Sequence, residues 1–271
     1  MNKENKLPNW ISEPCPLTDG SIQRANEEMA RIYRQEALEE QRKKFIIINS
    51  TETLPVSGQI NQIAILYADV FRGPPWNEAV KCGSCGKYEG ESVAVNSPCS
   101  CGGCFSEAYP LSETIRYIES ETQKPGFRLS QAKSGEQIVG FAWSYLVTPA
   151  KLIVDKWEDP QNRQAMLGVL EKNGLNPDTQ FRYFCEIGIA PEFRGQGLSN
   201  YLTGQVTGPE PTVFRTSSGT KMMAVGSTLG FEQIMGPVAV IDRSGGIIIP
   251  TGEVINCLDS ERPDRVLFLK P

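Results

Sequence analysis

Residues 186–202 constrain the fold of this chain of 271 residues more than any other run. The run begins with the apolar alternation of a β-strand, passes through a turn at Gly195 and Gly197, and continues with Leu198 and Leu202 at helical spacing. A glycine turn that opens a helix leaves backbone N–H groups without partners at the positive end of the helix dipole. The run therefore predicts a strand–turn–helix unit with an anion site at the turn, and a pyrophosphate suits such a site.

The spacing of this turn excludes two common nucleotide motifs. A phosphate-binding loop needs Gly, four residues and then Gly-Lys-Ser/Thr, and the chain contains no such run. A dinucleotide fingerprint needs a third glycine where this chain has Asn200. The run instead resembles the acyl-CoA signature Arg/Gln-x-x-Gly-x-Gly/Ala of the GNAT superfamily of N-acyltransferases. Arg194, Gly197 and Ser199 fall on its fixed positions, and Ser199 is a small residue in place of Gly/Ala.

Segments on both sides of this signature follow the order found in the same family. Upstream, residues 127–133 and 138–147 predict two strands joined by a short turn. Downstream, residues 212–215 predict a strand and residues 218–229 a helix, after which Gly230 suits a left-handed helix end. The resemblance implies the GNAT fold, of α+β or mixed α/β class, in which helices flank a central mixed and mostly antiparallel sheet.

The resemblance also implies acetyl-CoA as cosubstrate and direct transfer of its acetyl (acyl) group to a primary amine. In this family the cofactor lies along the turn and the strand before it. A backbone N–H near Gly188 or Ile189 is expected to stabilise the charge that develops on the thioester oxygen. The residues expected to hold the cofactor are Ile187, Ile189, Arg194, Gly195, Gln196, Gly197, Leu198 and Ser199.

Glu186 is the candidate catalytic base, because GNAT proteins often carry a carboxylate at this point of the strand, close to the acceptor. A carboxylate is far more acidic than an alkylamine, so Glu186 is expected to relay the proton through water or to bind the ammonium. The alternative is a structural glutamate. Many members also carry a tyrosine four residues before the Gly-Phe pair that follows the late helix. This chain has Gly226 there, so the general acid is not assigned.

The acceptor side of the family implies substrate contacts from the segment after the first helix of the domain. Trp76 and Glu78 are expected there to meet a cationic amine by ring contact and by charge, with a packed loop tryptophan as the alternative. Tyr145, on a strand that faces the expected acceptor cleft, is a further candidate. The acceptor itself is not identified: a small amine or amino-sugar is the first expectation, and a protein or aminoacyl-tRNA amine is the second.

The composition narrows the chemistry further. The chain contains no histidine, which removes the usual general base, the Ser–His and Cys–His pairs and histidine metal ligands. A net charge of −5 argues against general nucleic-acid binding. No apolar run approaches the roughly 18–20 residues of a membrane helix, and the first residues lack the apolar core of a signal peptide, so a cytoplasmic protein is expected.

Five of the eight cysteines form a cluster with the spacing C-x2-C-x13-C-x-C-x2-C. Two cysteine knuckles at such spacing are typical of a structural Cys₄ zinc ribbon, and a reducing compartment favours metal over disulfides. An iron–sulfur cluster is the alternative metal centre. Cys82 and Cys85 form the first pair; Cys101 and Cys104 repeat its spacing and are preferred as the second, with Cys99 as the alternative ligand.

We expect a GNAT acyltransferase domain over 43–271 that carries two insertions, a zinc ribbon at 80–106 and a helical segment at 148–179. The second insertion is a candidate lid or specificity element. Residues 1–42 are expected to form an extension whose helix, over about 21–44, docks its apolar stripe on this chain or on a second subunit, as in a homodimer. The rival function is a non-catalytic CoA-sensing or protein-binding module that uses the ribbon and this helix as contact surfaces.

Overall fold

The computed structural model describes residues 28–29, 32, 46–50, 55–237, 240–241, 247–248, 254–255, 259 and 264–271. The chain divides into two compact units, Met1–Lys44 and Phe45–Pro271, and the fold and site described below belong to the second unit. Most of the helix expected over about 21–44 lies outside the described residues. Met29 and Ile32, which the structure does describe, are helical and exposed.

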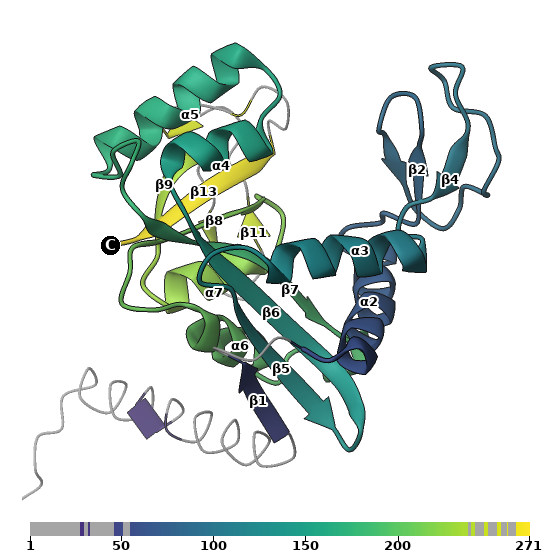
Figure 1. The fold of residues 1–271 in the computed structure, drawn as a ribbon, viewed down its shortest axis with the longest axis horizontal. Coiled ribbons are helices and arrows are strands. Elements are labelled where there is room, and N and C mark those ends of the chain that lie inside the picture. Colours follow the sequence, from purple (N-terminus) through teal and green to yellow (C-terminus); the bar gives the residue numbers. More distant parts are fainter. Residues whose placement is uncertain are drawn as a thin grey trace, which may run out of the picture. The chain divides into compact units, whose positions relative to one another are not determined.

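A mixed sheet of eight described strands forms the centre of the second unit (Figure 1). Its strands are β1 (Ile46–Ser50), β5 (Arg128–Ser134), β6 (Gln137–Val147), β7 (Phe181–Ile189), β8 (Thr212–Ser217), β13 (Arg265–Lys270), β9 (Glu232–Pro237) and β12 (Val254–Ile255), in this spatial order. In the described ladders β7 and β8 run parallel, and the other neighbouring pairs run antiparallel. The expected class, a mixed and mostly antiparallel sheet flanked by helices, is confirmed.

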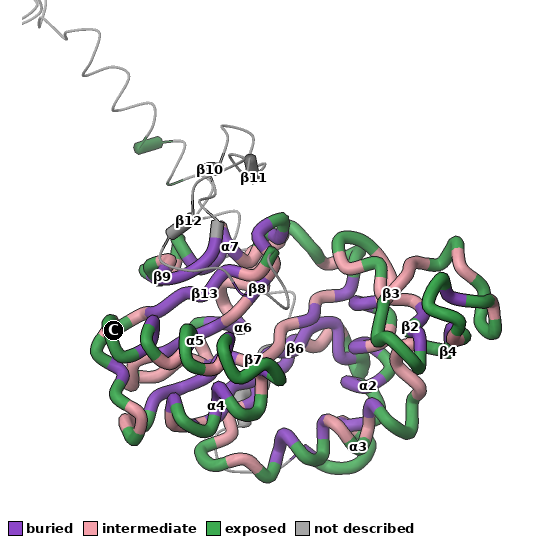
Figure 2. Tube along the Cα trace, turned by 90° about the horizontal axis from the view of Figure 1, so that it is seen from above, coloured by how far each residue is buried: buried purple, intermediate pink, exposed green. Residues whose placement is uncertain are grey.

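The hairpin of β5 and β6 lies between β1 and β7 in this sheet. Its register pairs Leu129 with Trp143 and Gln131 with Phe141, and the two strands fall where the apolar patterns predict them. Almost all of β6 is buried (Figure 2). Successive residues of a strand point to opposite faces, so Phe141, Trp143 and Tyr145 share one face of the sheet.

Helices cover both faces of the sheet. They are α2 (Ser57–Arg72), α3 (Leu111–Thr122), α4 (Pro149–Lys156), α5 (Pro160–Lys172), α6 (Leu198–Val206) and α7 (Met222–Thr228). On one face, α2 and α3 pack over Phe141 and Trp143, while α4 and α5 pack over Tyr145 and Val147. On the other face, α6 and α7 pack over Ala142. Within the described ranges, no helix combines the length and the apolar character that crossing a membrane requires.

Two small sheets lie outside this central layer. The cysteine-rich insertion between α2 and α3 forms an antiparallel sheet of β2 (Val80–Cys82), β3 (Tyr88–Glu89) and β4 (Phe105–Glu107), with β2 in the middle. It forms a lobe that follows α2 and precedes α3 (Figure 1). The second small sheet pairs β10 (Val240–Ile241) with β11 (Ile247–Ile248).

A buried arginine fixes one end of the β7–β8 pair. The Arg182 guanidinium, 1% exposed, donates to Ser144 Oγ of β6 at 3.1 Å and to the Gly126 carbonyl at 2.9 Å. It also forms an ion pair at 3.4 Å with Glu210, which precedes β8. Because an unpaired buried charge is costly, these contacts hold β6, β7 and β8 in register at this end of the sheet.

The packing of α7 generates a stability prediction. Gly226 lies against Phe214, and a Cβ atom at Gly226 would come within 2.7 Å of the Phe214 ring. We expect Gly226→Ala to lower the free energy of unfolding by about 1–3 kcal/mol, even though alanine favours a helix. Gly204→Ala on α6 is the matched control, because nothing lies within 4 Å of its Cβ position.

Gly204→Ala should be neutral or stabilise the protein by up to about 1 kcal/mol. Urea unfolding of the two variants measures the difference. Equal effects at the two positions would contradict the close packing of α7 on β8.

Candidate functional site

β7 and β8 separate part of the way along β7. Their parallel pairing ends where Phe184 lies opposite Phe214, while β7 continues, paired with β6. The Ala190 N–H donates to a β6 carbonyl at 2.9 Å. Because hydrogen bonding alternates along an antiparallel ladder, the N–H groups of Ile187 and Ile189 point away from β6, into the opening between β7 and β8.

A β-bulge at Cys185 decides which way the next side chain points. The β6–β7 register pairs Trp143 with Glu186 and the following β6 residue with Phe184, so Cys185 is an extra residue in β7. Cys185 and Glu186 therefore reach the same face of the sheet, whereas a regular strand places neighbours on opposite faces. The Tyr117 hydroxyl of α3 contacts both, at 3.1 Å from Glu186 Oε1 and 3.8 Å from Cys185 Sγ.

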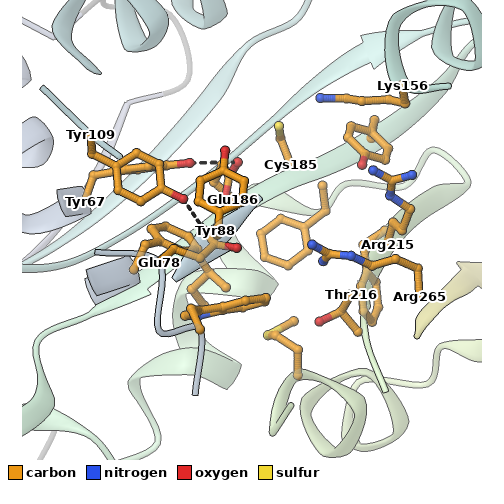
Figure 3. A pocket seen from close by; sticks show the side chains of 17 residues that line it. Tyr67, Glu78, Tyr88, Tyr109, Lys156, Cys185, Glu186, Arg215, Thr216 and Arg265 are labelled. Atoms are coloured by element: carbon orange, nitrogen blue, oxygen red, sulfur yellow. Dashed lines mark hydrogen bonds between the residues drawn. The ribbon is translucent and has the colours of Figure 1, made fainter. Parts of the chain in front are cut away.

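A cavity of about 270 Å³ lies at the opening between the two strands (Figure 3). Met222 of α7 and Phe214 of β8 line it from one face of the sheet, and Tyr67 of α2 and Lys156 of α4 line it from the other. Glu186 lies in its wall. The structure thus places the predicted base at an opening that reaches both faces of the sheet.

Glu186 is half-buried and accepts hydrogen bonds from two tyrosines, Tyr67 at 3.3 Å and Tyr117 at 3.1 Å. Burial raises the pKa of Glu186 to about 7, while the charge of Lys156 and the hydrogen bond from Tyr117 act in the opposite direction. Burial and the nearby Glu186 charge raise the pKa of both tyrosines, so both remain hydrogen-bond donors. A carboxyl group with a pKa near 7 can exchange a proton at neutral pH.

Aromatic and acidic side chains form one wall of the cavity. Trp76 and Glu78, both predicted as acceptor contacts, line this wall together with Tyr88 and Tyr109. The Tyr109 hydroxyl donates to Glu78 Oε2, and Tyr88 stacks on Tyr109 with ring centroids 6.3 Å apart. Tyr88 belongs to β3, so the cysteine-rich insertion contributes directly to this wall.

Three cations form a second wall, on the side where Figure 3 shows Lys156, Arg215 and Arg265. The Arg215 guanidinium donates to the buried Asp259 carboxylate at 3.0 Å. The Arg265 guanidinium lies over Trp76, 5.8 Å from the ring centroid. The sequence analysis missed all three, because no motif or spacing relates α4, β8 and β13. The expected lid at 148–179, which contains Lys156, was the only signal that pointed toward this wall.

The glycine turn after β7 has the expected form. Gly195 and Gly197 have φ angles of 77° and 76°, in the left-handed region that glycine adopts readily. Gly197 precedes α6 without a side-chain cap, which leaves the first-turn N–H groups to the backbone and to ligands. Arg194 donates to the Ile189 carbonyl at 3.1 Å and to the Pro74 carbonyl at 3.0 Å, so it ties the turn to β7 and to the loop after α2.

Two predicted site residues have side chains buried in the core. Tyr145 is 1% exposed and does not line the cavity, because α4 and α5 cover its part of the sheet face. The Lys124 ammonium lies 4.1 Å from the centroid of its ring. Leu198 is buried in the core under α6, which leaves its backbone N–H as its contribution to the turn. Ser199 follows in the first turn of α6.

Four cysteine sulfurs gather in the cysteine-rich sheet. Those whose Sγ atoms all lie within 4.8 Å of one another are Cys82, Cys85, Cys99 and Cys101. The preference for Cys104 over Cys99 is therefore corrected: Cys104 lies outside the group. A tight turn decides this, since the Gly102 N–H donates to the Cys99 carbonyl and the Cys99 N–H to the Gly103 carbonyl.

Backbone N–H groups lower the pKa of Cys82 and Cys99, while side-chain hydrogen bonds with the neighbouring cysteines raise the pKa of Cys101. Backbone N–H groups of Cys85 and Ser84 lower the pKa of Cys82 to about 6. A Cβ atom at Gly103 would lie 2.9 Å from Cys82 Sγ, so the two turns approach each other too closely for a side chain there. Four sulfurs in this arrangement can hold a metal ion with a preference for tetrahedral thiolate ligands.

No protein-family model and no curated protein sequence matches the chain significantly. Among solved structures, the chain is similar to arylalkylamine N-acetyltransferase 2 from Aedes aegypti, with 12% identity, 83% of this chain and 98% of that chain covered, and a TM-score of 0.45. The polyamine N-acetyltransferase of Drosophila melanogaster is also similar, with 12% identity, 83% of this chain and 99% of that chain covered, and a TM-score of 0.44. A Salmonella typhimurium protein solved with acetyl-CoA shows 11% identity, 83% of this chain and 92% of that chain covered, and a TM-score of 0.40. Similarity at this level assigns no activity, so the function is argued from the residues of this chain.

The raised pKa of Glu186 predicts a pH-dependent stability. A carboxyl group whose pKa is higher in the folded state stabilises the fold at low pH, and this contribution is lost as the pH rises through about 7. Glu186→Gln removes the group that ionises. The Tm of the variant, relative to the Tm of the wild type, should therefore be higher at pH 8.5 than at pH 5. Thermal unfolding at both pH values measures it, with the exposed turn variant Glu136→Gln as control.

Glu136→Gln should show the same Tm difference at both pH values. A Glu186→Gln difference that does not change with pH would show that Glu186 is solvated like a surface carboxylate.

Proposed function

We propose that this chain is a GNAT-type N-acetyltransferase that moves the acetyl group of acetyl-CoA to a primary amine. One observation carries the proposal: the half-buried Glu186 carboxyl lies in the wall of a cavity at the opening between β7 and β8. The N–H groups of Ile187 and Ile189 point into this opening, and the glycine turn follows directly. A proton acceptor, donors for an oxyanion and an anion site thus lie along one short stretch of chain.

The residues around the turn fit an acyl-CoA. The first-turn N–H groups of α6 suit its pyrophosphate, because they form the positive end of the helix dipole and no side chain caps them. Gly195 and Gly197 keep the backbone open to a bulky anion. We infer that the thioester enters the cavity between the strands, where the N–H of Ile187 or Ile189 stabilises the developing charge on its oxygen.

The chemistry is a direct transfer. Glu186 takes a proton from the acceptor ammonium, directly or through a water, and the amine nitrogen attacks the thioester carbonyl carbon. The C–N bond forms, the C–S bond breaks, and the sulfur leaves with the electron pair. The second proton of the attacking nitrogen passes to this thiolate or to water. A thiol pKa of about 8.5 lets CoA leave as a thiolate, so the tyrosine that Gly226 replaces is not required. Trp76 and Glu78 bind the cationic amine by ring contact and by charge.

We further infer that the four-cysteine group binds one structural zinc ion. Four sulfurs within 4.8 Å of one another suit a tetrahedral site, and a complete thiolate shell leaves no position for water. The ion would fix the turn that leads from Cys85 into β3. Because β3 carries Tyr88, the metal would then support the aromatic wall of the cavity.

Calorimetry with acetyl-CoA and a CoA-release assay with a panel of primary amines test the proposed activity. We expect wild-type protein to bind acetyl-CoA and to release CoA with at least one amine. Ser199→Asp places a carboxylate on the first-turn N–H groups, so it should weaken acetyl-CoA binding by about tenfold or more without destabilising the helix. Ser199→Ala is the control and should keep the affinity. Glu186→Gln should keep the affinity and lose turnover.

Two outcomes would contradict this. Unchanged acetyl-CoA affinity in Ser199→Asp would show that the phosphates do not bind at α6. Acetyl-CoA binding without CoA release for any amine would favour the non-catalytic CoA-sensing module instead.

The cysteine geometry predicts the metal content of two single variants. Wild-type protein should contain about one zinc per chain, and Cys104→Ser should keep it, since Cys104 lies outside the sulfur group. Cys99→Ser should lose most of the zinc and unfold at a lower temperature, because a structural zinc site contributes directly to folding. Metal analysis and thermal unfolding measure both effects. Zinc loss in Cys104→Ser but not in Cys99→Ser would reverse the ligand assignment.

A further inference from the structure

The charges around the cavity are separated into two groups. Glu186 and Glu78 lie with the aromatic side chains of one wall, and Lys156 and Arg265 lie on the other (Figure 3). Arg215 is also on this second wall. Both arginines have partners in the protein, since Arg215 pairs with the buried Asp259 and Arg265 lies over the Trp76 ring. An acceptor that carries only positive charge would meet favourable partners on one wall and repulsion on the other.

Lys156 is the cation on this wall that is available to bind an anionic group of a ligand. It is half-buried at the end of α4, and its ammonium lies 5.4 Å from the centroid of the Tyr183 ring. Within the part of the chain that the structure describes, it forms no ion pair. Burial acts to lower the pKa of Lys156, but nearby acidic groups, Cys185 first, raise it overall, so the side chain stays charged.

Arg265 adds a second cation to the same wall. It begins β13, where it pairs with Ser217 of β8, and its guanidinium lies over the Trp76 ring. Trp76, which Arg265 contacts, lines the cavity together with Glu78. The Lys156 ammonium suits a carboxylate oxygen, and Arg265 adds to the positive charge of the same wall.

We propose that the acceptor is an amino acid, whose amine lies at Glu186 and whose carboxylate lies at Lys156. This inference rests on the proposed transferase function and names its substrate class. The two ends of the ligand would match the two walls, and its side chain would pack on Tyr67, Tyr88 and Tyr109. A polyamine, which lacks an anion for Lys156, is disfavoured by the same arrangement.

Matched acceptor pairs that differ by one carboxylate test this. Wild-type protein is titrated with phenylalanine and 2-phenylethylamine, and with arginine and agmatine, and the same pairs are used in the CoA-release assay. The carboxylated member of at least one pair should bind about tenfold more tightly and be used with a correspondingly higher kcat/KM, since a charge-assisted hydrogen bond contributes on this scale.

Lys156→Met keeps the length of the side chain and removes its charge. The ratio of affinities between the carboxylated and the decarboxylated member of the pair should therefore fall to about one. Lys151→Met, on the exposed side of the same helix and away from the cavity, is the matched control and should keep the preference. The inference fails if the decarboxylated members bind as well or better, if Lys156→Met leaves the preference unchanged, or if no amino acid binds at millimolar concentration.

The titrations measure amino-acid binding and do not depend on catalysis. If amino acids bind with the expected preference but no acetyl transfer occurs, the proposed transferase function fails while the ligand class stands. If simple amines are acetylated and amino acids are not bound, the function stands and the ligand class fails.

Discussion

The end of hydrogen bonding between β7 and β8 at Phe184 is the constraint on which the candidate site depends. Arg182 fixes the paired part of these strands, and beyond Phe184 the two strands have different neighbours. A buried sheet normally satisfies its backbone donors, so N–H groups that point into an opening are available to a ligand. The cavity, the glycine turn and the start of α6 all lie at this opening. The candidate site is thus built from an interruption of the sheet rather than from a loop added to it.

The bulge at Cys185 places an ionisable side chain, Glu186, at this opening. Without the extra residue, Cys185 and Glu186 would face opposite sides of the sheet. With it, Glu186 meets the tyrosines of α2 and α3 and is buried enough for its pKa to rise to about 7. Burying an ionisable carboxyl group costs stability, and a carboxyl group with a shifted pKa at a cavity marks a candidate functional residue.

The cysteine-rich segment contributes a side chain to the wall of the cavity. Tyr88 of β3 lines the cavity and stacks on Tyr109, whose hydroxyl donates to Glu78. A second cavity, of about 460 Å³, lies between this insertion and the loop that follows β8, and Arg265 lines both cavities. The metal site that we propose would therefore influence ligand binding through the position of one aromatic wall. The helical segment of α4 and α5 contributes to the opposite wall through Lys156.

The sequence by itself determined the elements whose signals are local: the strand, glycine turn and helix around Gly197, the β5–β6 hairpin, and the cysteine cluster. In each, residues a few positions apart specify the backbone, because turns need glycine and buried faces need apolar periodicity. It also placed Trp76, Glu78 and Glu186 as candidates that the fold brings to one cavity. Tertiary structure alone decided the bulge at Cys185, the position of Cys99 rather than Cys104 beside the other sulfurs, the burial of Tyr145 under α4 and α5, and the placement of Lys156 and Arg265 on one wall of the cavity. These features depend on strand register and on which segments pack together across long stretches of chain, and no local pattern encodes such contacts.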